Sequence, residues 1–325
     1  MRSPVPLVAL VVVAAVAALA PWVGSAPSAL PPVQKFTDAT TAQGHSNPSW
    51  SPDGSKIAFE DRDSDPYNPS LYYKDYPAGS EAMLAASHRE GVAYSPDGSK
   101  IAYARVDGTW YHIYIRDAAG GAETAVTSGT AGPLYPPGSY GDWQPSFSPD
   151  GQWIAFSSSR ADTQNGQYDV WVVKVDGTGI KRIATGGYDA SFWPTWEPSG
   201  NAIVYSFQAQ LYRVPRTGVS TWGTSTLFAA NGNHPRFSHD GRFLAFDFNK
   251  DIVVMNYTTK VRYAITSDGA TSEDYAPTWG PADNEIAFSS KNRGGDPNTA
   301  IWVATGIQAV PTRTATLGRL KSDYR

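Results

Sequence analysis

Six short groups of residues in this sequence carry side chains that can do chemistry or bind a ligand. They combine imidazoles, carboxylates, amides, a guanidinium and large aromatic rings, and each group stands just ahead of one copy of a recurring segment. Aromatic rings can stack on a sugar or a peptide, while amides and carboxylates hydrogen-bond to it. The candidate binding residues are His45, Asn47, Arg89, Glu90, Asp142, Trp143, Gln144, Phe192, Trp193, Asn233, His234, Asp274 and Tyr275.

The carboxylates in this set offer an enzymatic alternative. A glycosidase uses two Asp or Glu side chains on either side of the scissile bond, one as the acid and one as the nucleophile or base. Glu90, Asp142 and Asp274 could supply such a pair. The sequence does not fix their separations, so polar lining of a loop rim is the other interpretation.

A second cluster of acids is a candidate metal site. Asp61, Asp63 and Asp65 alternate along one segment with Asn68 behind them, and Ca²⁺ prefers oxygen ligands of this kind. Pro66, however, stands where a calcium loop of the EF-hand type needs glycine, and no glutamate closes the loop. The calcium motif is therefore incomplete, and we expect neither a metal nor any other cofactor.

Composition limits the elements that can position these residues. The chain has 325 residues, with 41% hydrophobic residues, 17% charged residues, Gly 30, Pro 25 and 13% aromatic residues. The apolar content excludes a disordered chain, and the composition is not that of a coiled coil. A net charge of -4 argues against nucleic acid as a partner. Many turn formers and aromatic residues favour short strands joined by tight turns.

The N-terminus, residues 1–26, has the pattern of a secretory signal peptide. Arg2 supplies the positive charge, residues 5–20 are uncharged, and Ser25-Ala26 offers a cleavage site of small residues. An uncleaved anchor is the alternative, although the apolar run is near the lower limit for crossing about 30 Å. The sequence has no cysteine for lipid attachment or disulfides. We expect an exported protein, periplasmic or secreted, without stable membrane insertion.

An internal repeat organises the rest of the chain. Each copy has a first aromatic residue, a turn related to Ser-Pro-Asp-Gly, and a second aromatic residue nine positions after the first. Proline presets φ at the start of such a turn and glycine takes the left-handed position, so two strands must flank it. The copies span residues 48–59, 92–103, 145–156, 194–205, 235–246 and 277–288.

Two further strands follow in most copies, for example at 170–172 and 180–185. Four short strands repeated about every 46 residues are typical of β-propeller blades. We therefore predict an all-β, six-bladed propeller of four-stranded antiparallel blades over residues 27–306, followed by a C-terminal tail, 307–325.

The sixth copy lacks an evident fourth strand. Residues 33–37 are similar in sequence to the fourth-strand segments 180–185 and 261–266. We predict that they complete the last blade and close the ring, which leaves no unpaired sheet edge between the first and last blades. Residues 310–315 are the alternative.

The repeat resembles the WD40-like PD40 repeat of the TolB propeller family. The shared pattern is Pro-x-(Trp/Phe)-Ser-Pro-Asp-Gly-x-x-Ile-Ala-Phe, then a polar loop and an Ile-Tyr-Val-type strand, and it extends over residues 33–304. The resemblance implies the propeller part of TolB alone, without the additional α/β domain of that protein. Related propellers precede hydrolase domains in prolyl oligopeptidase-type peptidases, but the Gly-x-Ser-x-Gly motif is absent here.

One set of nitrogen and oxygen donors is similar to the manganese site of oligogalacturonate lyase, another propeller. In this chain His88 stands further upstream of its strand than the other histidines do, and the lyase has more blades. Ordinary surface histidines are the alternative interpretation. The set consists of His45, His88, Gln144 and His234.

The loops on the two faces of the predicted propeller differ in variability. The turns between first and second strands are short and repetitive, whereas the loops that lead into the first strands vary and carry the candidate binding residues. Variable loops on a rigid scaffold are where function usually lies. We predict a non-catalytic, monomeric binding module that engages a protein or peptide partner at the cell envelope through this rim. The alternative is a carbohydrate-active enzyme, a lyase or glycosidase, with its site in the central channel.

Overall fold

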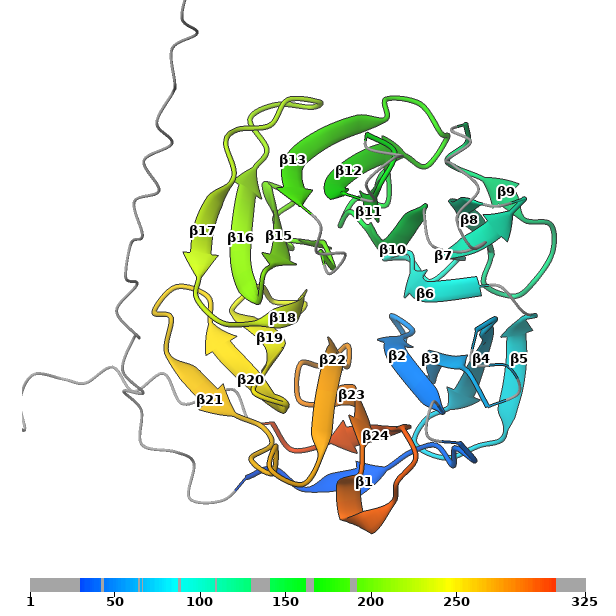
Figure 1. Ribbon diagram of the computed structural model, residues 1–325, viewed down its shortest axis with the longest axis vertical. Helices are drawn as coiled ribbons and strands as arrows, with labels where there is room; N and C mark the ends of the chain where they lie inside the picture. Colours follow the sequence, from blue (N-terminus) through cyan, green and yellow to red (C-terminus); the bar gives the residue numbers. More distant parts are fainter. Residues whose placement is uncertain are drawn as a thin grey trace, which may run out of the picture.

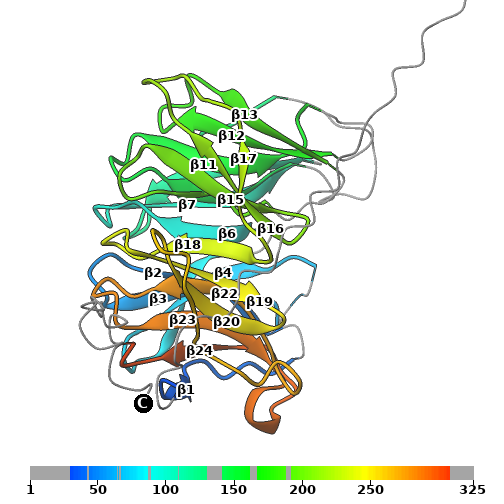
Figure 2. The same ribbon diagram turned by 90° about the vertical axis from the view of Figure 1, so that its left-hand side faces the viewer.

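The chain forms a closed ring of six four-stranded antiparallel sheets, seen here in a computed structural model (Figure 1). The structure describes residues 30–41, 44–63, 65, 67–86, 89–108, 110–129, 141–161, 167–187 and 192–307. Each sheet is one blade, and the blades stand around a common axis (Figures 1 and 2). The prediction of a six-bladed all-β propeller is confirmed. The predicted signal peptide, residues 1–26, and, beyond Ile307, the predicted C-terminal tail lie outside the described residues.

The inner strand of each blade borders the central channel. It ends at the first aromatic residue of the repeat, which turns away from the channel into the space between blades; Trp50 and Trp279, for example, are 6% and 3% exposed. The inner strands are β2 (His45–Trp50), β6 (Arg89–Tyr94), β10 (Asp142–Phe147), β14 (Thr195–Trp196), β18 (Asn233–Phe237) and β22 (Glu273–Trp279).

A tight turn joins each inner strand to the second strand. In the first blade the Gly54 N–H donates to the Ser51 carbonyl at 2.9 Å, and Gly54 has a φ of 73°, which glycine adopts without strain. The second strands are the most buried, and their small alanines allow the neighbouring sheet to approach. The second strands are β3 (Lys56–Asp61), β7 (Lys100–Asp107), β11 (Trp153–Ser158), β15 (Ala202–Phe207), β19 (Phe243–Phe248) and β23 (Ile286–Lys291).

The third and outer strands complete each blade, and the outer strands are the most exposed. One short 3-10 turn, η1 (Arg293–Gly295), follows β23. The third strands are β4 (Ser70–Asp75), β8 (Trp110–Asp117), β12 (Tyr168–Lys174), β16 (Gln210–Pro215), β20 (Asp251–Asn256) and β24 (Ala300–Ala304). The outer strands are β5 (Glu81–Ala85), β9 (Thr124–Ala125), β13 (Lys181–Gly187), β17 (Thr226–Ala229), β21 (Arg262–Ala264) and β1 (Val33–Lys35).

The apolar core lies between the blades rather than on the axis. One buried cluster, for example, joins Trp50 and Phe59 of the first blade to Ala287 and Ile301 of the last. Because this packing is completed between neighbouring sheets, the axis is left for polar side chains and for a channel.

The ring is closed by the N-terminal strand. β1 pairs antiparallel with β24, with Val33 opposite Ala304 (Figure 1, blue beside red). Beyond β1, the Phe36 N–H donates to the Ile301 carbonyl at 2.8 Å, and the Ile301 N–H donates to the Thr37 hydroxyl at 3.0 Å. The predicted closure by residues 33–37 is confirmed, because β1 occupies the outer place beside β24; the alternative segment 310–315 lies outside the described residues.

Truncating the closing segment should weaken the whole ring. Phe36 is 7% exposed and packs in the cluster between the first and last blades, so Phe36→Ala should lower the free energy of unfolding by about 3 kcal/mol. Gln34→Ala, at an exposed position of the adjoining strand β1, should change it by less than about 0.5 kcal/mol. Urea unfolding monitored by tryptophan fluorescence measures both, and equal effects would contradict the closing role.

Candidate functional site: the central channel

One residue at the same position of every blade has a left-handed backbone. The φ values run from 38° at Trp193 to 67° at Gly91. In blades one, two, three, five and six the pairing with the second strand shifts register here, which marks a β-bulge. We call these six residues the bulge ring. They are Asn47, Gly91, Gln144, Trp193, His234 and Ala276.

The backbone N–H groups of the bulge ring connect neighbouring blades. The Gly91 N–H donates to Glu60 Oε1 at 2.7 Å, and Glu60 belongs to the preceding blade, directly after the second aromatic residue of its repeat. Polar side chains from the adjacent blade accept in the same way at three other positions. Those bonds are Asn47 N to Ser289 Oγ at 3.0 Å, Trp193 N to Gln144 Oε1 at 3.1 Å, and Ala276 N to Asp247 Oδ1 at 3.2 Å.

The bulge ring also narrows the channel. Its larger side chains, those of Asn47, Trp193 and His234, surround a cavity of only about 20 Å³ together with Ala276 and neighbouring residues. That volume has room for little more than one water molecule. A small-molecule site usually needs several hundred Å³, so this level of the channel is a constriction.

Two carboxylates meet beside the constriction, between the first two blades. Arg62 Nη2 lies 2.9 Å from Glu60 Oε2 and 3.3 Å from Glu90 Oε2, and the Tyr111 hydroxyl donates to Glu90 Oε1 at 3.4 Å. Burial, followed by the nearby charge of Glu60, raises the pKa of Glu90 to about 7. Glu90 is thus a carboxyl that can exchange a proton near neutral pH.

Aromatic side chains gather toward the face that carries the variable loops, which we call the loop face, and two of them, Trp193 and His234, line the channel. The rings of Trp193 and His234 are 4.5 Å apart, and those of Tyr111 and Trp143 are 4.0 Å apart. Tyr275 lies 6.2 Å from His234 on its other side. We call these five residues the aromatic rim; four of them, all but the buried Tyr111, are half-buried, so they keep part of their surface in solvent.

His234 is oriented by a carboxylate. Its Nδ1 lies 2.5 Å from Asp247 Oδ1, which also accepts the Ala276 N–H. When His234 donates from Nδ1, its Nε2 is left as an acceptor. Asp247, like Glu60, was not among the residues singled out from the sequence. Both follow the second aromatic residue of a repeat, where the other blades carry serine or alanine, and a comparison of repeats would have found them.

Two predicted rim acids are directed into their own blades. Asp142 is fully buried, with Arg160 Nη2 and Ser158 Oγ each 2.5 Å from its carboxylate. Asp274 is 1% exposed and forms the same arrangement with Arg293 and Ser290. Both carboxylates are therefore occupied by protein donors, and Asp142 also accepts the hydroxyl of Thr127 from the preceding blade at 2.5 Å.

Three other candidates are partly or fully buried. Phe192 is fully buried in the core cluster between the third and fourth blades. Arg89 forms a two-point ion pair with Glu123, with both N···O distances at 3.0 Å. Asn233 is half-buried and opposite Asp247 in the strand pairing.

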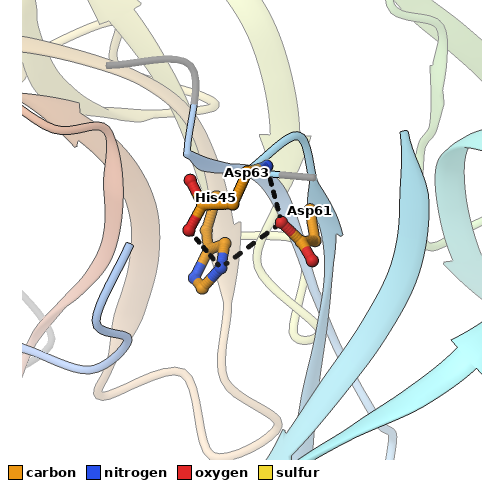
Figure 3. Close-up of side chains that lie close together, drawn as sticks. All are labelled: His45, Asp61 and Asp63. Atoms are coloured by element: carbon orange, nitrogen blue, oxygen red, sulfur yellow. Dashed lines mark hydrogen bonds and ion pairs between the residues drawn. The ribbon is translucent and has the colours of Figure 1, made fainter. Parts of the chain in front are cut away.

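The acidic loop forms a different cluster from the predicted one (Figure 3). His45 Nε2 lies 3.7 Å from Asp61 Oδ1 and 3.8 Å from Asp63 Oδ2. Asp65 instead accepts from the Tyr67 N–H at 2.9 Å and from Asn68 Nδ2 at 2.7 Å, within its own turn.

The Asp63 carboxylate is already saturated by protein donors. It accepts the N–H and the hydroxyl of both Thr40 and Thr41, at 2.6 to 2.9 Å. This arrangement ties the loop to the segment that follows β1, which accounts for the cluster without an ion. Of the proposed histidine set, His88 lies outside the described residues, and His45 is grouped with the two aspartates rather than with His234.

The ring of four-stranded blades around a polar channel defines a β-propeller. Residues 39–234 match the PD40 family, described as the TolB beta propeller domain, and the chain belongs to that family. The uncharacterized protein Atu1656 of Agrobacterium fabrum is 32% identical over 150 residues, which are 42% of this chain and 46% of that protein. The chain therefore spans about half the length of this relative.

Solved structures share the fold. TolB from Acinetobacter baumannii aligns with a TM-score of 0.55 and 19% identity, over 80% of this chain and 63% of that chain. The gluconolactonase XC5397 from Xanthomonas campestris aligns with a TM-score of 0.61 and 14% identity, over 87% of this chain and 99% of that chain. Within the part of the chain that the structure describes, no helix is long and apolar enough to cross a bilayer.

The raised pKa of Glu90 makes stability depend on pH. Its ordinary value is 4.5 and its value in the folded chain is about 7, so the folded protein holds this proton more tightly. The resulting stabilisation is complete below pH 4.5 and is lost as the pH rises through 7. Glu90→Gln should therefore gain about 1–3 kcal/mol relative to wild type between pH 4.5 and pH 8. Chemical unfolding at both pH values measures this, with the exposed Glu81→Gln as the control; parallel pH profiles for Glu90→Gln and wild type would refute it.

The structural role of Asp142 has its own test. Asp142→Asn leaves the buried Arg160 guanidinium without its counter-charge, so we expect a loss of about 3 kcal/mol in unfolding free energy. Asp117→Asn removes the partner of Lys100 at a site where the Asp117 side chain is 67% exposed and should cost less than about 1 kcal/mol. Urea unfolding measures both variants. If Asp142→Asn leaves the unfolding free energy unchanged, Asp142 does not have this structural role and is again a candidate functional group.

Proposed function

We propose that the protein is a non-catalytic binding propeller that engages a protein or peptide partner through the loop face around its channel. The observation that carries the proposal is the aromatic rim above a constriction of about 20 Å³. A narrow polar opening surrounded by half-buried Trp, Tyr and His side chains resembles the centre of a protein interface more than a substrate pocket.

The polar groups near the rim support the same function. Asp142 and Asp274 are buried in ion pairs with arginines of their own blades, so they are not available for acid–base work. Tyr67, in the loop between β3 and β4 on the loop face, is 85% exposed. An exposed tyrosine beside the rim extends the surface that a partner can contact.

The location at the cell envelope rests on the signal-peptide pattern of residues 1–26 and on the family. TolB-like proteins are periplasmic, and an exported product of this family would meet its partners there. The leader itself lies outside the described residues.

An enzyme acting on carbohydrate is the second candidate, and Glu90 is the observation that favours it. A carboxyl with a pKa of about 7 is suited to proton transfer at neutral pH. The gluconolactonase with the same fold shows that propellers of this shape can be enzymes. Against this candidate, the Arg62 guanidinium lies within ion-pair distance of both carboxylates, and the constriction leaves little room for a sugar.

Partner capture tests the binding function. Tagged wild type, Trp193→Asn and Tyr67→Ser should be compared in pull-downs from envelope extract, with bound proteins quantified by mass spectrometry. Asn fits the left-handed position of Trp193, as Asn47 does in the first blade. We expect the specific partner of the wild type to fall at least tenfold with either variant.

The matched control is Tyr263→Asn, which removes a half-buried aromatic residue from the outer strand β21. It should retain the partner. An unchanged partner set with both rim variants, or hydrolysis or cleavage of a saccharide that Glu90→Gln abolishes, would overturn the non-catalytic assignment.

A further inference from the structure

The channel widens below the bulge ring, toward the face that carries the Ser-Pro-Asp-Gly turns, which we call the turn face. A cavity of about 360 Å³ lies there. All six blades line it, and the turn prolines Pro52, Pro96 and Pro149 at its edge show that it opens at the turn face. This volume is within the range of small-molecule sites, unlike the constriction above it.

The cavity is wide because most blades carry a small side chain at one position of the repeat, two residues after the bulge-ring residue. Five blades carry a small, uncharged residue there, and the fifth blade alone carries an arginine. All six of these residues line the cavity. The six are Ser49, Ala93, Ser146, Thr195, Arg236 and Thr278.

Arg236 stands between the two levels of the channel. It lines the small cavity at the constriction as well as the large one below, and its guanidinium lies 5.9 Å from the centre of the Trp193 ring. Its Nη1 donates a hydrogen bond to the carbonyl of the adjacent Pro235 at 3.0 Å. Among the residues with described positions, none forms an ion pair with it, whereas Arg62, Arg160 and Arg293 each have a carboxylate partner.

A half-buried guanidinium without a counter-ion is an energetic cost that a bound anion would offset. Taking a cation out of water is unfavourable unless it is paired, and Arg has five N–H donors in a planar fork that matches an oxyanion. Burial lowers the pKa of Arg236 only to about 10, so the side chain keeps its charge at neutral pH. The hydroxyls of Ser49 and Thr278 on the same level can donate further hydrogen bonds.

We propose that the turn-face cavity binds a small ligand through a carboxylate held by Arg236. A single positive charge matches the single negative charge of a carboxylate better than the double charge of a phosphate. The prolines among the lining residues supply apolar contact for the rest of the ligand. This site is separate from the loop face, so it goes beyond the partner-binding function proposed above.

Small probes of matched shape test the charge requirement. Benzoate and benzamide have similar shapes, but only benzoate carries a carboxylate; inorganic phosphate is the third probe. The indole N–H of Trp279 donates to the Arg236 carbonyl at 3.2 Å, so its NMR resonance reports on this level of the channel. We expect benzoate, and neither benzamide nor phosphate, to shift that resonance and to raise the melting temperature.

Three variants locate the site. Arg236→Thr installs the residue of the fourth and sixth blades and should weaken benzoate binding at least tenfold, while Arg236→Lys should keep part of the affinity. Arg242→Thr removes the same charge from an exposed position of the same blade and should bind like wild type. Failure of millimolar benzoate to bind the wild type, equal affinity for benzamide, preference for phosphate, or unchanged binding by Arg236→Thr would each refute the proposal. Loss of partner capture through Trp193→Asn is an independent result, because it concerns the loop face.

Discussion

The hydrogen bond from a bulge-ring N–H to a polar side chain of the neighbouring blade is the contact on which the shape of the central channel depends most. It occurs where the strand has left the regular ladder, so the donor has no partner within its own sheet. The neighbouring blade supplies that partner, as Glu60 does for Gly91. Since an unpaired buried N–H is costly, each such bond favours one angle between adjacent blades. Ring size and channel width therefore depend on this contact as well as on the apolar packing between sheets.

The same bulge divides the channel into two different environments. On its loop-face side, the inner strands carry large aromatic and charged residues, and the channel is narrow. On the turn-face side, side chains are small in five blades, and a cavity results. The charged groups of the channel lie where one blade departs from the repeat. Glu60 and Asp247 replace small residues directly after the second aromatic residue, and Arg236 replaces a small residue two positions after the bulge ring.

The repeated features of the sequence predicted the fold well because they act locally. Proline and glycine determine the turns, and the similarity of residues 33–37 to other outer strands was sufficient to predict ring closure. The rim was predicted less completely, because the bulge reverses the alternation of side chains along the inner strand. Asp142 and Phe192 are buried in the protein instead. The sequence indicates the bulge only in part: Asn47, Gly91 and His234 are residue types that favour a left-handed backbone, whereas Trp193 and Gln144 are not.

The pairing of β1 with β24 also bears on how the protein is made. Val33 and Ala304 are neighbours in space but lie at opposite ends of the folded chain. During synthesis the first strand emerges long before its partner β24 exists, and it must wait unpaired. The last blade consequently assembles by a contact of very large sequence separation, which is slow to form. Until then the growing propeller is an open arc with an exposed sheet edge, the form in which it is most exposed to aggregation and to chaperones.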